Sequence, residues 1–448
     1  MGFSQALSGV NAASQQLDVV GNNIANSQTT GFKSSSVQFS DVFANSQVGL
    51  GTRVAGVLQD FGNGNLETTG RNLDLAISGT GFYRFEQEGQ IGYSRNGQLT
   101  MTAQGDLVNA QGAKIMGYGL GGGPFSEVVT GGQPVAMNIP ADDMPAQATG
   151  AEGGVKAVYN LDASIDETDA TTLNTVNVAA TLADGTTAKT ALNYHYSSSY
   201  TVYDSLGNQR NATVYFEKTG DNAWKGTMAI DGIVSASALA DADNDGVADA
   251  GSVTLQNQFD IAFNDSGKLN SITQGGTTTT APNITPPSIQ FASEQLGGAP
   301  ADLNFDFALT GTTQFANDST QNSLVQDGYT SGTLVGITIA DDGTIMRNFT
   351  NEKSVASGQI ALANFRNPEG LKAAGDNMWA ATAESGAEVI GTAGIGQFGS
   401  IESGTLEASN VDLTKELVDL IIAQRNYQAN TNSIRTQSEV MDQIAQLR

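Results

Sequence analysis

The sequence contains no cysteine and a single histidine, and these two deficits remove several kinds of chemistry. Without cysteine there is no disulfide, no thiolate metal site and no thiol nucleophile. The one histidine, His195, stands in the stretch NYHYSSSY. A histidine-pair metal site is therefore excluded, and a Ser-His-Asp triad would depend on this residue alone. We interpret His195 as a strand or turn histidine and predict no catalytic residue.

Positive charge and long apolar runs are also scarce. Lys and Arg total 20 against 46 Asp and Glu, a formal net charge of −26. Such a polyanion repels nucleic acid and anionic lipid, so neither is expected as a partner. No run approaches the ~20 apolar residues that span a bilayer. The first residues, MGFSQALSGV, lack the basic and apolar regions of a secretory signal, so we expect no cleaved signal peptide.

Proline is missing from both ends of the chain, and both ends carry heptad repeats. All 9 prolines fall between Pro124 and Pro368, so neither end contains a helix breaker. Apolar residues recur at helical spacing near the N-terminus at Phe3, Leu7, Val10, Leu17 and Ile24, and near the C-terminus at Leu413, Leu417, Leu420, Tyr427, Ile434 and Met441. This pattern predicts two long helices that pair with each other. Ser409 or Asn410 is expected to cap the second helix, with Asp412 completing a capping box.

The middle of the chain shows the sequence pattern of β-structure, with strand-like runs separated by turn residues. Asn96-Gly97, between IGYSR and QLTM, predicts a tight hairpin. Three further hairpins are predicted where polar turns separate strand-like runs, at 206–208, 265–267 and 341–343. We therefore predict a multidomain α+β fold, with paired terminal coiled-coil helices and largely all-β middle domains.

Composition shifts divide the chain into three predicted domains. Glycine and proline clusters at 119–145 and 275–300 bracket its most acidic part, and residues 141–330 hold 23 acidic and 6 basic residues. The predicted domains are a terminal helical assembly domain with linker (1–70 with 405–448), an inner β domain (71–143 with 304–404) and an inserted outer acidic β domain (144–303).

Two short motifs raise the question of a cofactor or a metal. GIGQFG at 394–399 matches the dinucleotide pattern, but SIESGTLEASN follows it without the required helical period, so we interpret it as a glycine-rich loop and expect no cofactor. In DADNDGVAD, Asp241, Asp243, Asp245 and Asp249 occupy positions typical of a calcium loop, although Ser252 replaces the usual final Glu. A solvated acidic loop is the favoured interpretation, and Ca²⁺ binding is the alternative.

A different class of function stays open at this point. A secreted β-rich calcium-dependent adhesin or a carbohydrate-acting enzyme could be built on the β middle, with Trp224 or Trp379 stacking on a sugar. Only one acidic loop is present and nothing singles out a carboxylate pair, so this alternative is not favoured.

The N-terminal helix has little surface suited to bulk water. In the first 52 residues only Asp18, Lys33 and Asp41 are charged, whereas ordinary surface helices carry Glu and Lys. The helix is either buried in the protein's own core or surrounded by other copies, where Asn amides would set the register. We favour the second interpretation because both chain ends share the trait, and a head-to-tail contact between such ends generates an open helical polymer.

The two ends resemble a known family. GNNIANSQTTGFK (21–33), preceded by SGVNAASQQLDVV, and the C-terminal LEASNVDLTKELVDLIIAQRNYQANTNSIRTQSEVMDQIAQLR resemble the terminal signatures of bacterial flagellar rod and hook proteins. NLDLAISGTGFYRF and QIALANFRNPEGL extend the resemblance into the inner β region. The part from about 145 to 300 contributes little to it.

The resemblance implies how the ends are used. A helix over about 3–28 would pair with one over about 411–447, forming an inner tube around a central export channel. The residues at the end of the first helix and in the turn after it would be Asn22, Asn23, Ile24, Asn26, Gly31 and Phe32. The facing side would be supplied by Gln424, Arg425, Tyr427 and Asn430. Together with the apolar heptad residues they form the expected assembly interface.

The function implied by the resemblance is structural and not enzymatic. The subunit would polymerise into the curved, tubular hook, a flexible joint that transmits motor torque to the filament. Implied partners are further copies of the chain, the distal rod protein, the hook cap, hook-filament junction proteins and the flagellar type III export apparatus, which would deliver the chain to the cell exterior. A distal-rod subunit is the nearest alternative, but rod proteins are typically shorter and lack a large inserted domain. Like-charged outer domains would repel and make weak, replaceable contacts.

Overall fold

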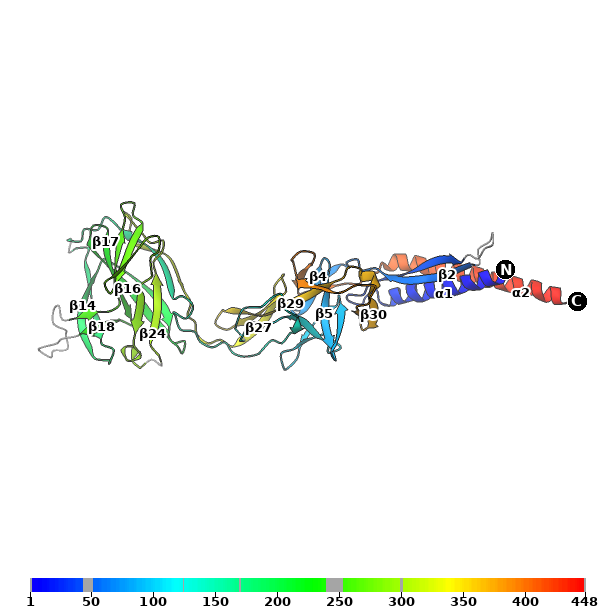
Figure 1. Cartoon of the computed structure of the whole chain (residues 1–448), viewed down its shortest axis with the longest axis horizontal. Coiled ribbons are helices and arrows are strands. Elements are labelled where there is room, and N and C mark those ends of the chain that lie inside the picture. Colours follow the sequence, from blue (N-terminus) through cyan, green and yellow to red (C-terminus); the bar gives the residue numbers. More distant parts are fainter. Residues whose placement is uncertain are drawn as a thin grey trace. The chain divides into compact units, whose positions relative to one another are not determined.

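The computed structural model describes residues 2–42, 51–123, 125–168, 171–238, 253–298 and 301–446. The chain forms two compact units: a terminal unit, Met1–Asp142 with Leu334–Arg448, and an inserted unit, Asp143–Thr333. Helices occupy the chain ends and β-structure lies between them, so the predicted multidomain α+β fold is confirmed (Figure 1).

The two long helices of the terminal unit run antiparallel. They are α1 (Gly2–Ala25) and α2 (Leu413–Gln446), and Figure 1 shows them side by side. Near the start of α1, Gly9 lies against Asn430, and near its end Asn23 bonds to Glu416. Contacts further along α1 therefore involve residues earlier in α2. No helix in the described ranges is long and apolar enough to cross a membrane.

The cap of α2 differs from the one predicted. The carboxylate of Asp412 accepts the backbone N–H groups of Thr414 (2.9 Å) and Lys415 (3.2 Å), which otherwise lack partners at a helix start. Asn410 cannot serve as the cap because its side chain is engaged elsewhere, accepting the N–H of Ser34 and donating to the carbonyl of Asp60.

A two-stranded ribbon follows α1 and packs along it. It consists of β1 (Ser35–Val42) and β2 (Gly51–Gln59), paired antiparallel with a bulge after Gln38. The hydroxyl of Ser8 accepts the N–H of Thr52 at 3.2 Å, which fixes the ribbon against the first half of the helix.

The β body of the terminal unit is built on one large sheet of order β27-β28-β29-β10-β5-β6-β31-β30, with β8, β9, β11 and β32 paired at its flanks. Smaller sheets are β33-β4-β7 and β3-β34. The buried core includes Leu75, Phe85, Ile115, Ile360 and Leu362. The bounds are β3 Leu66–Thr68, β4 Asp74–Ser78, β5 Phe82–Gln87, β6 Gln90–Ser94, β7 Gly97–Gln98, β8 Thr100–Met101, β9 Leu107–Val108, β10 Lys114–Tyr118, β11 Val135–Ala136, β27 Leu334–Ile339, β28 Thr344–Phe349, β29 Ser354–Asn364, a 3-10 turn at Pro368–Gly370, β30 Lys372–Gly375, β31 Met378–Ala380, β32 Val389–Thr392, β33 Ser400–Ser403 and β34 Thr405–Glu407.

The hairpin predicted at Asn96-Gly97 is wrong. Strand β6 pairs with β5, whereas β7 pairs with β4, so the Asn-Gly step carries the chain from one sheet to another. The glycine is needed for a different reason: a Cβ on Gly97 would lie 2.0 Å from the carbonyl oxygen of Leu75. The amide oxygen of Asn96 accepts the N–H of Gln98 and forms the local turn.

The inserted unit contains two sheets that share a core. One has the order β14-β13-β18-β17-β20-β21-β22, with β15 and β16 beside β17 and β19 beside β18; the other has the order β23-β24-β12-β25, with β26 beside β12. The core joins residues of both sheets, including Tyr159, Phe216, Trp224, Phe259 and Phe307. The bounds are β12 Val155–Asp162, β13 Asn174–Thr181, β14 Thr187–Tyr194, β15 Tyr196–Tyr203, β16 Gln209–Gly220, β17 Ala223–Ile230, β18 Ile233–Ala238, β19 Thr254–Leu255, β20 Gln258–Phe263, β21 Leu269–Gln274, β22 Thr277–Thr280, β23 Ser288–Phe291, a 3-10 turn at Ser293–Leu296, β24 Leu303–Ala308, β25 Thr313–Phe315 and β26 Thr320–Gln326.

The other three predicted hairpins are confirmed. Strand β15 pairs with β16 across 206–208, β20 pairs with β21 across 265–267, and β27 pairs with β28 across 341–343, all antiparallel. In each of these turns a glycine adopts positive φ, at Gly207, Gly267 and Gly343.

The inserted unit extends beyond the predicted boundary at 303. Residues 304–333 pack with it because β26 pairs antiparallel with β12, and β24 and β25 pair parallel with the same strand. Where the chain enters and leaves the unit, Met144 and Gly332 exchange backbone hydrogen bonds of 2.8 and 3.0 Å, and Gln147 and Tyr329 exchange bonds of 3.0 and 2.9 Å. These bonds, here called the clip, hold the entering and leaving segments together within the unit.

The predicted calcium loop cannot be assessed here. Asp241, Asp243, Asp245 and Asp249 lie outside the described residues, so Ca²⁺ binding stays a prediction that calorimetric titration would test. Among the residues that the structure describes, no group of three or more His, Asp or Glu side chains is placed to hold a metal ion.

Candidate assembly site

The contact between α1 and α2 is made by small and polar residues. On α1 the side chains buried beneath α2 and the β1-β2 ribbon are Ala6, Ala12, Ala13, Val20 and Asn23, and on α2 Ala423 is fully buried. Gly9 meets the side chain of Asn430 so closely that a Cβ would lie 2.8 Å from its amide. The seam on α2 therefore follows Glu416, Ala423 and Asn430, which are seven residues apart.

The large heptad residues do not form this seam, which differs from the prediction. Phe3 and Leu7 on α1 are exposed, Val10, Leu17 and Ile24 are half-buried, and on α2 Leu420 and Ile434 are half-buried while Leu413, Leu417, Tyr427 and Met441 are exposed. The physical reason is size: small residues let the helix backbones approach, and the bulky side chains lie beside or away from the contact. The two helices pair as predicted, but through a neighbouring stripe.

One side of α2 consequently carries a continuous exposed apolar surface, here called the outer apolar face. Its members are between 45% and 51% exposed and are Leu413, Leu417, Val418, Ile421 and Ile422. They recur at i, i+4, i+5, i+8 and i+9, so they share one side of the helix. A patch of this kind on a folded protein marks a contact surface.

The buried amide of Asn23 is used within its own chain. Its Nδ2 donates to the carbonyl of Ser35 (2.8 Å) and to Oε1 of Glu416 (3.1 Å), and its Oδ1 accepts the N–H of Ser35 (3.0 Å). Burial raises the pKa of the Glu416 carboxyl. With all of these bonds satisfied inside the chain, Asn23 joins α1, β1 and α2 and is not available to another copy.

The neighbouring predicted residues have local roles or face outward. Asn26 donates to the carbonyl of Asn22 at 3.0 Å and accepts the hydroxyl of Thr29 at 3.1 Å, which shapes the end of α1. Gln424 and Arg425 are exposed on α2. The amides of GNNIANSQTTGFK thus divide into one that ties the chain together and others that end the helix.

The turn after α1 docks on the β body. Gly31, with a φ of +69°, donates to the carbonyl of Glu407 at 2.8 Å, and a Cβ there would lie 2.7 Å from the backbone N of Asn96. Only glycine fits both the backbone conformation and this approach. Phe32 is half-buried, and its carbonyl accepts the N–H of Asn410 at 3.4 Å.

Directly after Phe32, a buried ionic cluster joins three distant parts of the chain. Lys33 follows the turn, Arg95 lies between β6 and β7, and Glu407 ends β34. Oε1 of Glu407 is 2.7 Å from Nζ of Lys33, and Oε2 is 3.4 Å from Nη1 of Arg95. Sequence reasoning missed this cluster, although Lys33 is the only basic residue in the first 52 and so was a signal.

A hairpin formed by β30 and β31 contacts both the turn after α1 and the segment 59–64 that follows β2, here called the connector. The indole N–H of Trp379 donates to the side chain of Gln59 at 2.8 Å, and the amide of Asn377 donates to the carbonyl of Thr30 at 3.1 Å. Phe61 packs edge-on against Trp379 and Phe82, with ring centroids 5.4 and 5.3 Å apart. The segments that leave α1 and β2 are thereby anchored to the large sheet.

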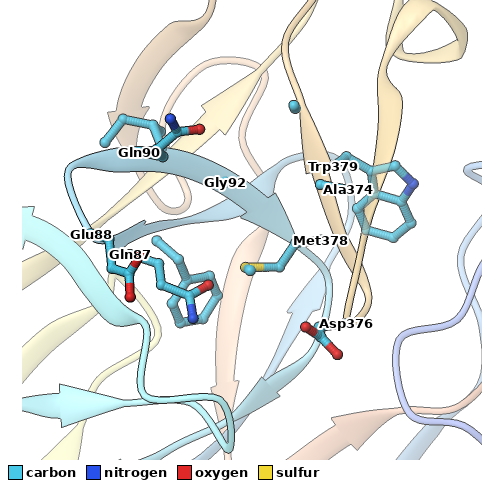
Figure 2. A pocket seen from close by; sticks show the side chains of 11 residues that line it. Gln87, Glu88, Gln90, Gly92, Ala374, Asp376, Met378 and Trp379 are labelled. Atoms are coloured by element: carbon cyan, nitrogen blue, oxygen red, sulfur yellow. The ribbon is translucent and has the colours of Figure 1, made fainter.

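The opposite face of this hairpin borders an open pocket, drawn in Figure 2. Met378 points into it from β31, and the neighbouring Trp379 also belongs to its lining. Glu88 and Asp376 stand at its rim, and Phe85 and Ile91 line it. The lining contains no paired nucleophile and base, so the pocket offers no catalytic arrangement.

The two remaining motifs have structural positions. GIGQFG lies in the loop between β32 and β33, and a strand follows it where a dinucleotide site needs a helix. His195 joins β14 to β15; its Nδ1 accepts the N–H of Lys218 at 3.0 Å and its ring packs edge-on against Trp224. Burial lowers the pKa of His195.

Family models match most of the chain. They are described as Flagella basal body rod protein (residues 4–33), Flagellar hook protein FlgE/F/G D1 domain (76–157), Flagellar basal body protein FlaE D2 domain (160–329) and Flagellar basal body rod FlgEFG protein C-terminal (402–447). The D2 match falls inside the inserted unit, and the first and last matches cover the two helices.

Whole-chain sequence comparisons agree with these matches. The chain is 41% identical over 452 residues to the flagellar hook protein FlgE of Salmonella typhimurium and 40% identical over 449 residues to that of Escherichia coli, in both cases over 100% of each chain. Among solved structures it is similar to the Helicobacter pylori flagellar hook protein FlgE2, with a TM-score of 0.47 and 13% identity over 75% of this chain and 99% of the other.

Proposed function

This chain belongs to the flagellar hook protein family and is a structural subunit of the hook, and from that premise we propose that the outer apolar face of α2 carries the contacts between copies. A distal-rod subunit, the nearest alternative, is not favoured, because the full-length relatives are hook proteins. Enzymatic activity is not expected of a chain whose relatives have this structural role.

The proposal is supported by the difference between two sides of α2, one packed against α1 and the other exposed. Its seam with α1 is occupied by Glu416, Ala423 and Asn430, while Leu417, Val418 and Ile421 are about half exposed. Because each is only about half exposed, covering one such side chain would contribute roughly 1 kcal/mol, about half the value for complete burial. Several on one helix face favour association, and a heterologous contact of this kind extends into a filament.

The same proposal covers partners and location. In the hook, the chain would contact the distal rod protein at one end of the polymer and the cap and hook-filament junction proteins at the other. We also propose delivery through the flagellar type III export apparatus. These roles rest on the family and on the terminal helices that its members share.

A direct test changes the outer apolar face without touching the seam. We expect the double variant Val418→Gln and Ile421→Gln to raise the concentration needed for polymerisation by about tenfold or more, since apolar contact area is lost. The matched control is Thr436→Gln, at an exposed polar position of the same helix. Sedimentation measures the concentration at which polymers form, and electron microscopy shows whether they are tubes. Tubes that form at the unchanged concentration would refute the proposal.

A further inference from the structure

The ionic cluster of Lys33, Arg95 and Glu407 is unusual in charge as well as burial. The three side chains are 0%, 3% and 0% exposed. Two are cations and one is an anion, so a single carboxylate serves two positive charges. Asp60 and Tyr83 are the other titratable groups close enough to act on it, and burial raises the pKa of the Tyr83 hydroxyl, which keeps it neutral.

The bonds of Glu407 reach both the N-terminal connector and the body. Its Oε1 accepts Nζ of Lys33 and, at 2.8 Å, the N–H of Gly64, while its backbone carbonyl accepts the N–H of Gly31. Its strand, β34, pairs with β3, where Glu407 lies opposite Leu66. One residue of the C-terminal segment therefore contacts the turn after α1 at Gly31 and Lys33 and the connector at Gly64.

The cations are held by neutral acceptors in addition to Glu407. Lys33 donates to the carbonyl of Gly62 at 2.6 Å. Arg95 donates to the carbonyls of Gly79 (2.6 Å) and Ile77 (3.2 Å) and to the side chain of Asn63 (2.9 Å). These bonds orient the cations but cannot neutralise them, and burial lowers the pKa of both Lys33 and Arg95 while Glu407 opposes the shift.

We propose that Glu407 couples the two chain ends: the turn after α1 and the connector at 59–64 dock on the β body only when the C-terminal strand β34 is in place. Without its carboxylate, Lys33 and Arg95 remain as two uncompensated charges in a site closed to water. Breaking a buried pair in this way is among the most destabilising changes known in folded proteins.

The net charge left in the cluster predicts how severely each variant should loosen the docking. A purely steric role of these side chains would not predict this order. The native cluster has a net charge of +1. Glu407→Gln keeps the shape and the acceptor but leaves +2, whereas Lys33→Met loses two hydrogen bonds but leaves a matched Arg95 and Glu407 pair. Adding Lys33→Met to Glu407→Gln returns the net charge to +1, so the double variant should be milder than Glu407→Gln alone.

The test is hydrogen exchange read by mass spectrometry on the full-length, unpolymerised chain. In Glu407→Gln we expect amides at 26–34 and 59–64 to exchange about 100-fold faster or more, as loss of a buried pair implies, with a smaller effect in Lys33→Met and partial recovery in the double variant. The control is Glu402→Gln on β33, which removes the same charge from a half-buried position. Strands β5 and β29, in the large sheet of the terminal unit, report whether that unit has folded in each variant.

Two results would overturn the coupling. One is an effect of Glu407→Gln confined to β3 and β34, with native protection at 26–34. The other is an effect of Lys33→Met equal to or larger than that of Glu407→Gln. The coupling does not rest on the proposed role of α2 in assembly. Because the exchange is measured before assembly, a failed coupling and a failed assembly proposal give different results.

Discussion

Nδ2 of Asn23 donates a hydrogen bond of 3.1 Å to Oε1 of Glu416, across 393 residues of sequence, and ties the end of α1 to the first turn of α2. The same amide closes a pair of bonds with the backbone of Ser35. A single side chain thus fixes a helix, its partner helix and the following strand.

Replacing Asn23 should loosen this corner of the terminal unit. Asn23→Ala removes three hydrogen bonds, two of them to the backbone of half-buried Ser35, so we expect a loss of roughly 2–3 kcal/mol in the free energy of unfolding. Asn26→Ala is the control, since its amide bonds only within the end of α1, and it should cost less than about 1 kcal/mol. Helical circular dichroism during thermal unfolding measures both; equal losses would contradict the assignment.

The close approach of Gly9 to Asn430 predicts a size limit at the seam. Gly9→Ala should be nearly neutral, because a gain of about 1 kcal/mol in helix propensity offsets a small shift of the Asn430 amide. Gly9→Leu should separate the helices and lower the melting temperature, and Asn430→Ala should restore part of the loss. Gly21→Leu is the control, since a Cβ at Gly21 meets nothing within 4 Å. A similar loss at both glycines would argue against the seam.

His195 predicts acid sensitivity of the inserted unit. Its pKa in the fold lies below the ordinary 6.5, mainly because of burial, so the unfolded chain binds the proton more readily. Stability from this group is complete above about pH 6.5 and falls as the pH drops through the window below it. We expect the unfolding free energy to decrease between pH 7 and 5.5, and His195→Gln to flatten that slope. An unchanged slope would exclude His195 as its source.

The acidic middle predicts a response of the polymer to salt. Residues 141–330 hold 23 acidic and 6 basic residues, and raising ionic strength from 0.1 to 1 M shortens the Debye length from about 10 to about 3 Å. If repulsion keeps the outer contacts weak and replaceable, the bending stiffness and curvature of hooks should change over this range. Electron micrographs of polymers in both buffers provide the measurement, and identical curvature and stiffness would sink the idea.

Much of the fold could be predicted from local signals. Heptad spacing in proline-free ends predicted α1 and α2, and glycine-containing polar turns between strand-like runs predicted three hairpins. The hairpin prediction at Asn96-Gly97 was wrong because the glycine is needed for another reason. It leaves room for the backbone of Leu75 on β4, with which β7 pairs. The end of the inserted unit at Thr333 was missed because it depends on β26 returning to β12, a pairing that leaves no local mark.

The site was predicted in outline but not in its chemistry. Sequence spacing placed the two helices together, yet it could not tell that small residues at Gly9 and Ala423 would occupy the seam and leave Ile421 outside. Nor could it distinguish the buried Lys33 and Glu407 from ordinary surface charges, because their burial is decided by segments 374 residues apart.

The clip formed by Met144 with Gly332 and Gln147 with Tyr329 makes the inserted unit a module. The segments where the chain enters and leaves the unit are held side by side by backbone hydrogen bonds of the unit itself. The two ends of the inserted unit therefore lie close together. Insertions at such closely spaced ends are tolerated by host domains. The inserted unit can therefore change or lengthen without altering the fold of the terminal unit.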